Sequence, residues 1–446
     1  MKNNIEVGIG RACITPTTPL GLAGYFNLRM WEEVLDDIEV RVIIFRQDDK
    51  YFTVIQYDLI CVSKNLLKKT LTALKNAGIY QIDSNNSIFT ATHTHTAPEI
   101  RPERKGFESE YIDFAAQKTV EAVKKALNDF EQCSIYETCV KELRFSFNRR
   151  FWMKNGEVIT NPGKLNPDII RPEGEIDPEI PLLCFKSNEN IKALIVNIVN
   201  HADTTGGSKV SADWPGHTIR QLQNNAQIVV PIIGCSGNIN HFDIASSKPQ
   251  TSPEEAQRIG QGYAESIRKG LKSLTPVDSS NIKTFCSKFE IQPRKLSADE
   301  VAEAKRIIKK YHNVQVDFQG GPDLTAEDLA KKTPFALKYF AICLLKNASE
   351  AGSQSINLTG ISFGKNIIVS LPNEPFTEIG LRIKKASGTD KNVMIASLAN
   401  GSGTGYIPNI WNYGRGGYET TPRSNPFALD TSELLINKIL EKIKTL

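Results

Sequence analysis

Several features are scarce or absent in this 446-residue sequence, and each absence excludes a class of protein. No apolar run approaches the about 20 residues that a membrane-spanning helix needs. Lys and Arg number 54 against 50 acidic residues, a net charge of +4 without a dense basic stripe, so nucleic acid is not an expected partner. The eight cysteines are dispersed and form no CxxC pair, which argues against a disulfide scaffold and against a zinc–thiolate site.

The N-terminus, MKNNIEVGIGRACITP, lacks the apolar core of a secretory signal. We therefore expect a cytoplasmic location for the sequence as it stands, and a periplasmic or secreted one if a signal has been removed. Repeats and low-complexity tracts are also missing. With 40% hydrophobic and 23% charged residues, the chain can form a large core, and we expect its partner to be a small-molecule substrate.

Apolar runs typical of buried strands alternate with helical patterns along the chain. Residues 51–60 and 87–95 predict strands, while 63–77 and 109–130 predict amphipathic helices. Ser63 is a suitable N-cap for the first of these helices, and Gly78 a suitable stop. Later strands are predicted at 193–199, 228–233, 367–371 and 393–398, and a last helix at 431–444. Short buried strands between helices favour an α/β fold, with mixed sheets flanked by helices.

Two segments depart from this alternation. Residues 150–180 are rich in Pro, Gly and Asn and predict a long loop. Residues 295–350 are rich in Lys, Ala and Glu and predict two helical stretches separated by QGGPD. We interpret 295–350 as a helical insertion on the core, either a lid or a solvated helix pair.

Polar segments follow five of the apolar strands. HTHTAP follows the strand at 87–92, NHADTTGG that at 193–199, GCSGNINHFD that at 228–233, PNEPF that at 367–371, and ANGSGTGY that at 393–398. Ligands of open α/β sheets bind beyond the carboxyl ends of the strands. Five such ends with functional groups therefore predict one shared site.

Histidines at these strand ends indicate a metal site. His93 and His95 are one residue apart, so in an extended strand both imidazoles lie on one face. That spacing suits two metal ligands, or one ligand beside a catalytic base, although two surface histidines would give the same pattern. His201 follows another strand, and Glu374 lies in a Pro-flanked turn after a third. Together these residues make a His/His/Glu zinc site plausible.

A series of motifs extends this interpretation to the whole chain. The N-terminal VGIGRACITP and LGLAGY are followed in order by ATHTHTAPE, FNRR, NHAD, SADWPG, GCSGNIN, LPNEPF and LANGSGTGYIP. In these motifs and in their order the sequence resembles the neutral/alkaline ceramidase family, whose corresponding histidine motif reads ATHTHSGP. The resemblance spans nearly all of residues 1–446 as one catalytic domain and is weakest at 295–350.

The resemblance implies a catalytic zinc and assigns roles to individual residues. The implied zinc ligands are His93, His201, Glu374 and Tyr406. His95 matches the histidine beside the metal that serves acid/base chemistry. Arg149 of FNRR matches an arginine that contacts the reacting carbonyl region, and the adjacent Arg150 is retained as a substrate contact.

Two departures from the family pattern bear on the substrate. The ceramidases carry a serine in a GDVSPN segment, where this sequence has Asn240, followed by His241, a further candidate substrate contact. An amide cannot act as a hydroxyl nucleophile, but it can donate a hydrogen bond to an oxyanion. The family's C-terminal immunoglobulin-like domain has no counterpart in the sequence given. Both departures point away from ceramide itself.

We therefore expect a zinc-dependent hydrolase that cleaves an N-acyl (amide) bond. Zinc chemistry on a carbohydrate or uronate, by elimination or hydrolysis, is the alternative, because polar and aromatic residues near Tyr406 suit a sugar or a carboxylate. The candidate substrate contacts of this loop are Trp411, Tyr413 and Arg415, which could also serve loop packing. A third alternative is a non-catalytic ligand-binding relative.

Overall fold

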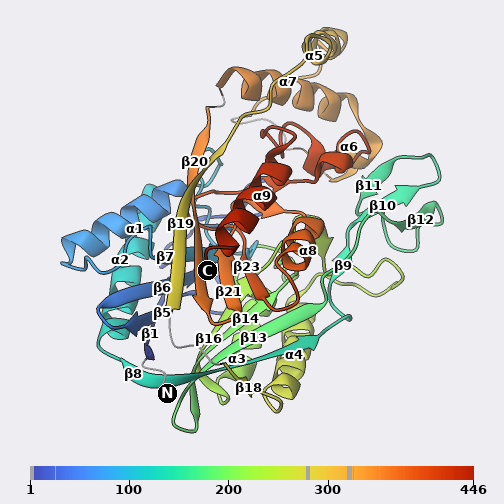
Figure 1. Cartoon of the computed structure of the whole chain (residues 1–446). Coiled ribbons are helices and arrows are strands. Elements are labelled where there is room, and N and C mark those ends of the chain that lie inside the picture. Colours follow the sequence, from blue (N-terminus) through green and yellow to red (C-terminus); the bar gives the residue numbers. More distant parts are fainter. Residues whose placement is uncertain (1–4, 26, 278–281, 319–323, 325, 351) are drawn as a thin grey trace.

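The computed structural model describes residues 5–25, 27–277, 282–318, 324, 326–350 and 352–446. A nine-stranded mixed sheet forms its centre, with the order β16-β14-β13-β8-β1-β5-β6-β7 and a short β18 beside β8 (Figure 1). Its strands are β1 (Ile5–Cys13), β5 (Glu39–Gln47), β6 (Lys50–Tyr57), β7 (Ser87–Ala91), β8 (Glu131–Lys141), β13 (Glu179–Ser187), β14 (Asn190–Ile198), β16 (Ala226–Ile233) and β18 (Thr275–Pro276). Only the outermost pairs, β6/β7 and β14/β16, are parallel.

A second sheet of four strands packs on the first. Its order is β19-β20-β21-β23, and β21/β23 is its parallel pair. The strands are β19 (Ile282–Ile291), β20 (Gln354–Phe363), β21 (Asn366–Ser370) and β23 (Asn392–Ala396). Tight two-residue turns join β5 to β6 and β13 to β14, and both need a left-handed residue, supplied by Asp48 (φ 53°) and Asn188 (φ 53°).

Alternation of side chains along the strands produces four layers. Between the two sheets lie side chains such as Phe45, Phe185 and Phe363, whose rings are 4.7–5.2 Å apart between centroids. The opposite face of the large sheet is covered by α1 (Lys64–Asn76), α2 (Ser109–Leu127), α3 (Asp213–Leu222) and α4 (Pro253–Gly270). The outer face of the small sheet is covered by α8 (Thr377–Ala386) and α9 (Thr431–Ile443). The predicted α/β class with mixed sheets and flanking helices is confirmed.

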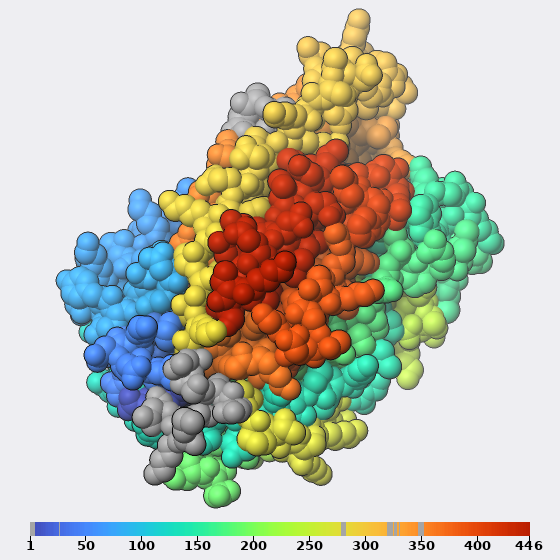
Figure 2. All heavy atoms as spheres, viewed as in Figure 1, coloured from blue at the N-terminus to red at the C-terminus, as the bar shows by residue number. Residues whose placement is uncertain are grey.

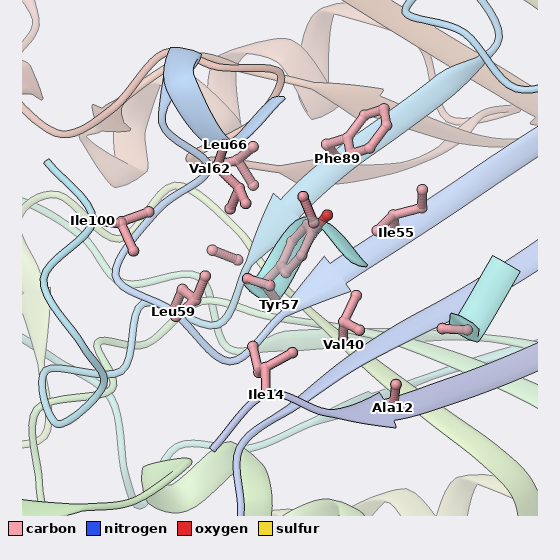
Figure 3. Packing of buried hydrophobic residues seen from close by; sticks show 14 of the residues in the cluster. Ala12, Ile14, Val40, Ile55, Tyr57, Leu59, Val62, Leu66, Phe89 and Ile100 are labelled. Carbon is pink, nitrogen blue, oxygen red and sulfur yellow. The ribbon is translucent and has the colours of Figure 1, made fainter. Parts of the chain in front are cut away.

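The packing of α1 and α2 illustrates how the sequence produces this layer. Buried apolar side chains, among them Ile14, Val40 and Leu66, form the core there (Figure 3). Within it the hydroxyl of Tyr57 lies 3.0 Å from that of Thr119 on α2 and 3.4 Å from that of Thr70 on α1. A buried tyrosine hydroxyl needs such partners. As predicted, Ser63 caps α1, accepting a hydrogen bond from the amide of Leu66 at 3.2 Å, and Gly78 (φ 77°) follows its end.

The segment predicted as a long loop is in part a small antiparallel sheet. Its strands are β10 (Arg150–Met153), β11 (Val158–Thr160) and β12 (Ile169–Pro172). The loop prediction for 150–180 was therefore wrong over these strands. Turn residues dominate the composition there, whereas each strand has only three or four residues and gives little periodic signal.

Helices lie on both sides of the predicted separator within 295–350, between β19 and β20. The first predicted stretch is α5 (Ala298–Lys310), and the second consists of two helices, α6 (Ala326–Lys331) and α7 (Pro334–Glu350). Figures 1 and 2 show α5 projecting from one end of the molecule. The QGGPD separator lies outside the described residues. In the described parts of the chain, no helix is both long and apolar enough to cross a membrane.

Short paired strands connect the loops above the sheets. They are β2 (Gly21–Leu22) with β3 (Arg29–Met30), β4 (Glu33–Val34) with β15 (Lys209–Val210), β9 (Phe147–Asn148) with β17 (Ile239–Asn240), and β22 (Glu374–Pro375) with β24 (Tyr406–Ile407). The two ends of the large sheet also approach each other: Gln56 on β6, the strand next to the edge strand β7, donates a hydrogen bond to the carbonyl of Pro231 on the opposite edge strand β16 at 3.2 Å. Loops that follow distant strands are thereby brought together.

Candidate metal centre

The five strand ends singled out in the sequence meet at one place. After β23 and β16, the amide of Ser397 donates to the carbonyl of Ile233 at 2.9 Å, and the carbonyl of Ser397 accepts from the hydroxyl of Thr90 on β7 at 2.9 Å. After β16 and β21, the amide of Gly237 donates to the carbonyl of Pro375 at 2.9 Å. A Cβ on Gly237 would lie 2.4 Å from the carbonyl oxygen of Glu374, so glycine is required for this approach.

Three imidazoles converge at the centre of these loops. The Nε2 atoms of His93 and His201 are 3.0 Å apart, and those of His93 and His95 are 3.4 Å apart. All three residues are buried, and their ring nitrogens lie within 4.8 Å of one another. Nitrogens that share one metal ion at about 2.0–2.1 Å have separations of this size. A buried group of three histidines that could hold a metal ion is therefore present.

The two histidines of HTH converge by a different route from the one predicted. The strand β7 ends at Ala91, and His93 has a left-handed backbone with φ 63°. The prediction of an extended strand through residue 95 was therefore wrong at its end. The amide of His93 donates to the carbonyl of Leu59 at 3.0 Å, and this contact with the loop after β6 holds the turned backbone. Strain of this kind is common at functional sites.

The surroundings of His93 and His201 suit metal ligands. Their Nδ1 atoms face backbone carbonyls, that of Ile60 at 2.6 Å and that of Ser236 at 3.4 Å. A carbonyl at Nδ1 fixes the tautomer and leaves the Nε2 lone pair free for a metal. Burial, followed by the charge of His93, lowers the pKa of His201 well below its usual value, so its imidazole is kept in the neutral form that binds metals.

Glu374 adds a carboxylate to the three imidazoles. Its Oε2 lies 3.3 Å from Nε2 of His93, and its Oε1 accepts a hydrogen bond from the amide of Gly405 at 3.3 Å. Burial works against its charge, but His93 and Arg149 hold its pKa below the usual value. Within the described residues, Oε2 is buried without a hydrogen-bond partner. A buried carboxylate oxygen without a hydrogen-bond partner among the described residues, beside three imidazole nitrogens, is a donor set that fits a zinc ion.

Tyr406, the fourth predicted ligand, lies beside Glu374 in the parallel pair β22/β24. Its hydroxyl is 3.4 Å from that of Tyr418. Burial, then the charge of Glu374, raises the pKa of the Tyr406 hydroxyl well above its usual value. Tyr418 carries no sequence motif of its own and was missed by sequence reasoning.

The guanidinium groups of Arg149 and Arg150 contact different partners, which distinguishes the roles of the two residues. The Arg149 guanidinium lies 5.2 Å from the ring centre of Tyr406 and 5.5 Å from that of Tyr418, and it donates to Oε1 of Glu419 at 3.0 Å. Arg150 instead donates to Oε2 of Glu419 at 2.7 Å and forms an ion pair with Glu173. Arg149 thus faces Tyr406 and Tyr418 of the centre, while Arg150 binds the other oxygen of the same Glu419 carboxylate.

His95 has a different environment from the other two histidines. Its Nδ1 lies 3.5 Å from Oδ1 of Asp203, and that oxygen accepts a hydrogen bond from the hydroxyl of Tyr25 at 2.8 Å. Gly24 packs so closely that a Cβ there would lie 2.5 Å from the imidazole. Burial, then the charge of His93, lowers the pKa of His95 well below its usual value. Asp203 was missed, although its place two residues after His201 in NHAD was a usable signal.

The loop that carries His201 is held by α3. The carboxylate of Asp213 accepts hydrogen bonds from the amides of Thr204 at 2.9 Å and Thr205 at 2.7 Å. The indole of Trp214 donates to the carbonyl of His201 at 2.8 Å. These contacts give the SADWPG motif a positioning function.

The side-chain contacts of Asn240 and His241 run to Asn161, to Phe242 and to the loop before α4. The amide of Asn240 donates to Oδ1 of Asn161 at 2.7 Å and accepts from the amide of Phe242 at 3.0 Å. Nε2 of His241 lies 2.6 Å from the carbonyl of Gln250. The predicted roles of both residues toward substrate stay predictions.

The three candidate contacts of the Tyr406 loop are dispersed. Trp411 is 41% exposed, and the guanidinium of Arg382 lies 5.3 Å from its ring. The hydroxyl of Tyr413 accepts from Asn425 at 2.6 Å, and Arg415 lies 3.5 Å from Glu173. Their binding of substrate likewise stays a prediction, and these contacts are those of loop packing.

Comparison with known proteins agrees with this architecture. No protein-family model and no curated protein matches the sequence. Among solved structures, the neutral ceramidase from Pseudomonas aeruginosa matches with a TM-score of 0.74 at 15% identity, over 99% of this chain and 74% of that chain. A ceramidase complexed with C2 matches with a TM-score of 0.72 at 15% identity, over 99% and 75%. The chain therefore has a neutral ceramidase-like fold, as its motifs predicted.

Proposed function

We propose that this protein is a zinc-dependent hydrolase of the ceramidase kind that cleaves an N-acyl (amide) bond. The observation that carries the proposal is the convergence of three buried histidine nitrogens, 3.0–3.4 Å apart from one to the next. Oε2 of Glu374 lies 3.3 Å from Nε2 of His93 and has no hydrogen-bond partner among the described residues. The likeness of the fold to that of solved ceramidases supports the reaction class.

In this proposal the zinc ligands are His93, His201, Glu374 and Tyr406, and His95 is the base. The tautomers of His93 and His201 are fixed by backbone carbonyls at Nδ1, as ligands require. Nδ1 of His95 has no hydrogen-bond partner within the described residues and faces Asp203 instead. A bound zinc ion supplies Lewis-acid chemistry, which polarises a carbonyl and makes water nucleophilic at neutral pH.

His95 is placed to move the protons of the reaction. A neutral imidazole accepts a proton from the attacking water, and the lowered pKa of His95 keeps it neutral. The proton raises the positive charge near Asp203, whose Oδ1 lies 3.5 Å from Nδ1 and accepts a hydrogen bond from Tyr25; burial raises the pKa of Asp203 to about 7, and a positive charge on His95 favours its ionised form. His95 then returns the proton to the leaving nitrogen.

Arg149 is placed to stabilise the oxyanion that forms on the carbonyl oxygen. Its charge is held in position by Glu419 and by the carbonyl of Gly237, which accepts a hydrogen bond at 2.7 Å. Fixed charges at a buried site are among the largest contributions to catalysis, because they need no reorganisation during the reaction.

The test is turnover of a substrate panel by purified, zinc-loaded protein. N-acyl lipids, a short-chain fluorescent ceramide and uronate-containing oligosaccharides are incubated with the native chain, with a chelator-treated sample and with His201→Ala. We expect release of free fatty acid from an N-acyl compound, lost on chelation and restored by zinc. Cleavage of the oligosaccharides alone would contradict amide hydrolysis and support the uronate alternative. No turnover of any compound would support a ligand-binding role.

A further inference from the structure

The N-terminal motif LGLAGY, residues 20–25, lies on the Nδ1 side of the His95 ring. A Cβ on Gly24 would lie 2.6 Å from Nδ1, and the ring of Tyr25 packs edge-on, with its centroid 6.0 Å from that of the imidazole. The hydroxyl of Tyr25 donates to Oδ1 of Asp203 at 2.8 Å, and the same oxygen lies 3.5 Å from Nδ1. Three segments that are distant in the sequence therefore meet at this nitrogen.

A single guanidinium connects these three segments. Arg29 is buried, and its Nη2 donates to the carbonyl of His95 at 2.5 Å and also to the carbonyl of Ala23. Its Nη1 donates to the carbonyl of Gly207, in the loop that follows β14. The guanidinium lies 3.8 Å from the centre of the Tyr25 ring, which is a cation–π contact. Arg29 thus holds the segment between β2 and β3, the loop after β7 and the loop after β14 against one another.

Nδ1 of His95 needs a hydrogen-bond acceptor. It is buried and has no hydrogen-bond partner among the residues that the structure describes, and leaving such a group unpaired is costly. The acceptor that the fold places beside it is Oδ1 of Asp203, at 3.5 Å. A small movement of the ring toward this oxygen completes a hydrogen bond from a proton on Nδ1. The amide of His95, which donates to the carbonyl of Ala202 at 3.0 Å, keeps the backbone beside that loop.

We propose that Asp203 and Tyr25 are positioning residues for His95. Asp203 accepts the hydrogen bond from Nδ1, and Tyr25 fixes the accepting oxygen. The imidazole is then held in the tautomer whose Nε2 lone pair faces the metal site, 3.4 Å from Nε2 of His93. A carboxylate has this function in catalytic triads, where its replacement by an amide leaves the base in the wrong tautomer. The orientation of His95 follows from the contacts alone, and only the use of Nε2 as a base rests on the proposed function.

The tautomer of His95 can be measured directly by nitrogen NMR. The full chain with isotope-labelled histidine is studied at pH 8 in the presence of zinc, and the His95 signals are identified by their loss in His95→Gln. We expect the native chain to carry the proton on Nδ1. Asp203→Asn should reverse the tautomer, because the side-chain amide donates to Nδ1 and leaves the proton on Nε2. Tyr25→Phe, which loses only the hydroxyl, should give a mixture of both tautomers.

Turnover of an N-acyl substrate shows what the orientation contributes to the reaction. Tyr25→Phe should lower kcat about tenfold, the usual effect of one hydrogen bond, and Asp203→Asn should lower it at least about a hundredfold. KM should stay nearly unchanged, because neither residue is placed to bind substrate. Tyr80→Phe is the matched control, since Tyr80 is 70% exposed, and it should change neither the tautomer nor kcat. Thermal midpoints of all variants confirm that the fold is retained.

The inference and the proposed function fail in different ways. A proton on Nε2 in the native chain would overturn the inference without any Asp203 or Tyr25 variant having to fold. A tautomer that is unchanged in Asp203→Asn or in Tyr25→Phe would overturn it as well, whatever the activity. Expected tautomers without turnover of any N-acyl compound would leave the positioning of His95 standing and contradict the proposed amidase function. A reversed tautomer with unchanged kcat would contradict the use of Nε2 as the base.

Discussion

Replacing Glu419 with glutamine should destabilise the protein and disorder one side of the candidate centre. The Glu419 carboxylate is fully buried and accepts hydrogen bonds from Arg149, Arg150 and Thr160 at 3.0, 2.7 and 2.7 Å. Glutamine has nearly the same shape, so the substitution removes the charge and one acceptor without creating a cavity. Arg150 retains Glu173, but Arg149 loses its carboxylate partner.

The expected magnitude follows from the burial of these charges. Removing one partner of a buried ion pair costs about 3–5 kcal/mol, because a charge is left without compensation. Burial alone would raise the pKa of Glu419, yet the charges of Arg150 and Arg149 hold it below the usual value of 4.5. A lowered pKa means that the ionised carboxylate stabilises the fold above pH 4.5 and that this contribution is lost as the pH falls. Glu419→Gln should therefore weaken the acid sensitivity of the native chain.

Urea denaturation at pH 7 and at pH 4 measures both effects. Glu441→Gln is the control, since Glu441 is exposed and pairs with Lys438 and Lys442 at the surface. We expect a much lower free energy of unfolding for Glu419→Gln at pH 7, a smaller difference from native at pH 4, and little change for the control. If Glu419→Gln lowers the free energy of unfolding at pH 7 by no more than Glu441→Gln does, the account of Glu419 as the charge that holds Arg149 is refuted.

Three further predictions concern the centre and the fold. After dialysis and elemental analysis, His93→Ala should retain no zinc and Tyr406→Phe should bind it more weakly. His95→Ala should keep one ion per chain but lose activity. If His95→Ala loses its zinc while Tyr406→Phe keeps it, His95 and not Tyr406 is the fourth ligand. Gly24→Ala places a Cβ 2.5 Å from the imidazole of His95 on a backbone with φ 101°, so it should lower kcat about a hundredfold and also lower the thermal midpoint; normal kcat would contradict the close packing. Ser63→Ala removes the cap of α1 and should cost about 1 kcal/mol in urea denaturation without affecting zinc content.

Much of the fold was predictable because its elements carry local signals. The strands of the two sheets read as apolar runs, and α1 carries both its cap and its stop within a few residues of the predicted positions. Strands such as Val158–Thr160 were missed because three residues among turn-forming neighbours have no measurable period. The ends of strands were also extended too far, as at His93, where a contact with Leu59 turns the backbone.

The candidate site was predictable only in its residue types. Functional groups at the strand ends identified the three histidines and Glu374, since ligands gather at that edge of such sheets. Nδ1 of His93 faces a backbone carbonyl, whereas Nδ1 of His95 faces Asp203, and this difference depends on loops that are distant in sequence.

The loops of the candidate centre have strained backbones at several strand ends. Four described non-glycine residues in the polar segments after these strands have left-handed backbones: His93 (φ 63°), Asn373 (φ 57°), Leu398 (φ 57°) and Asn400 (φ 55°). Such conformations are costly for residues with a Cβ, and they persist only where neighbouring contacts enforce them. Here the amide of Leu398 donates to the carbonyl of Asn373 at 3.0 Å, and Asn373 in turn donates to the carbonyls of Ser402 and Thr404 on the Tyr406 loop. The loops that carry the proposed ligands therefore hold one another in strained positions, as a preorganised metal centre requires.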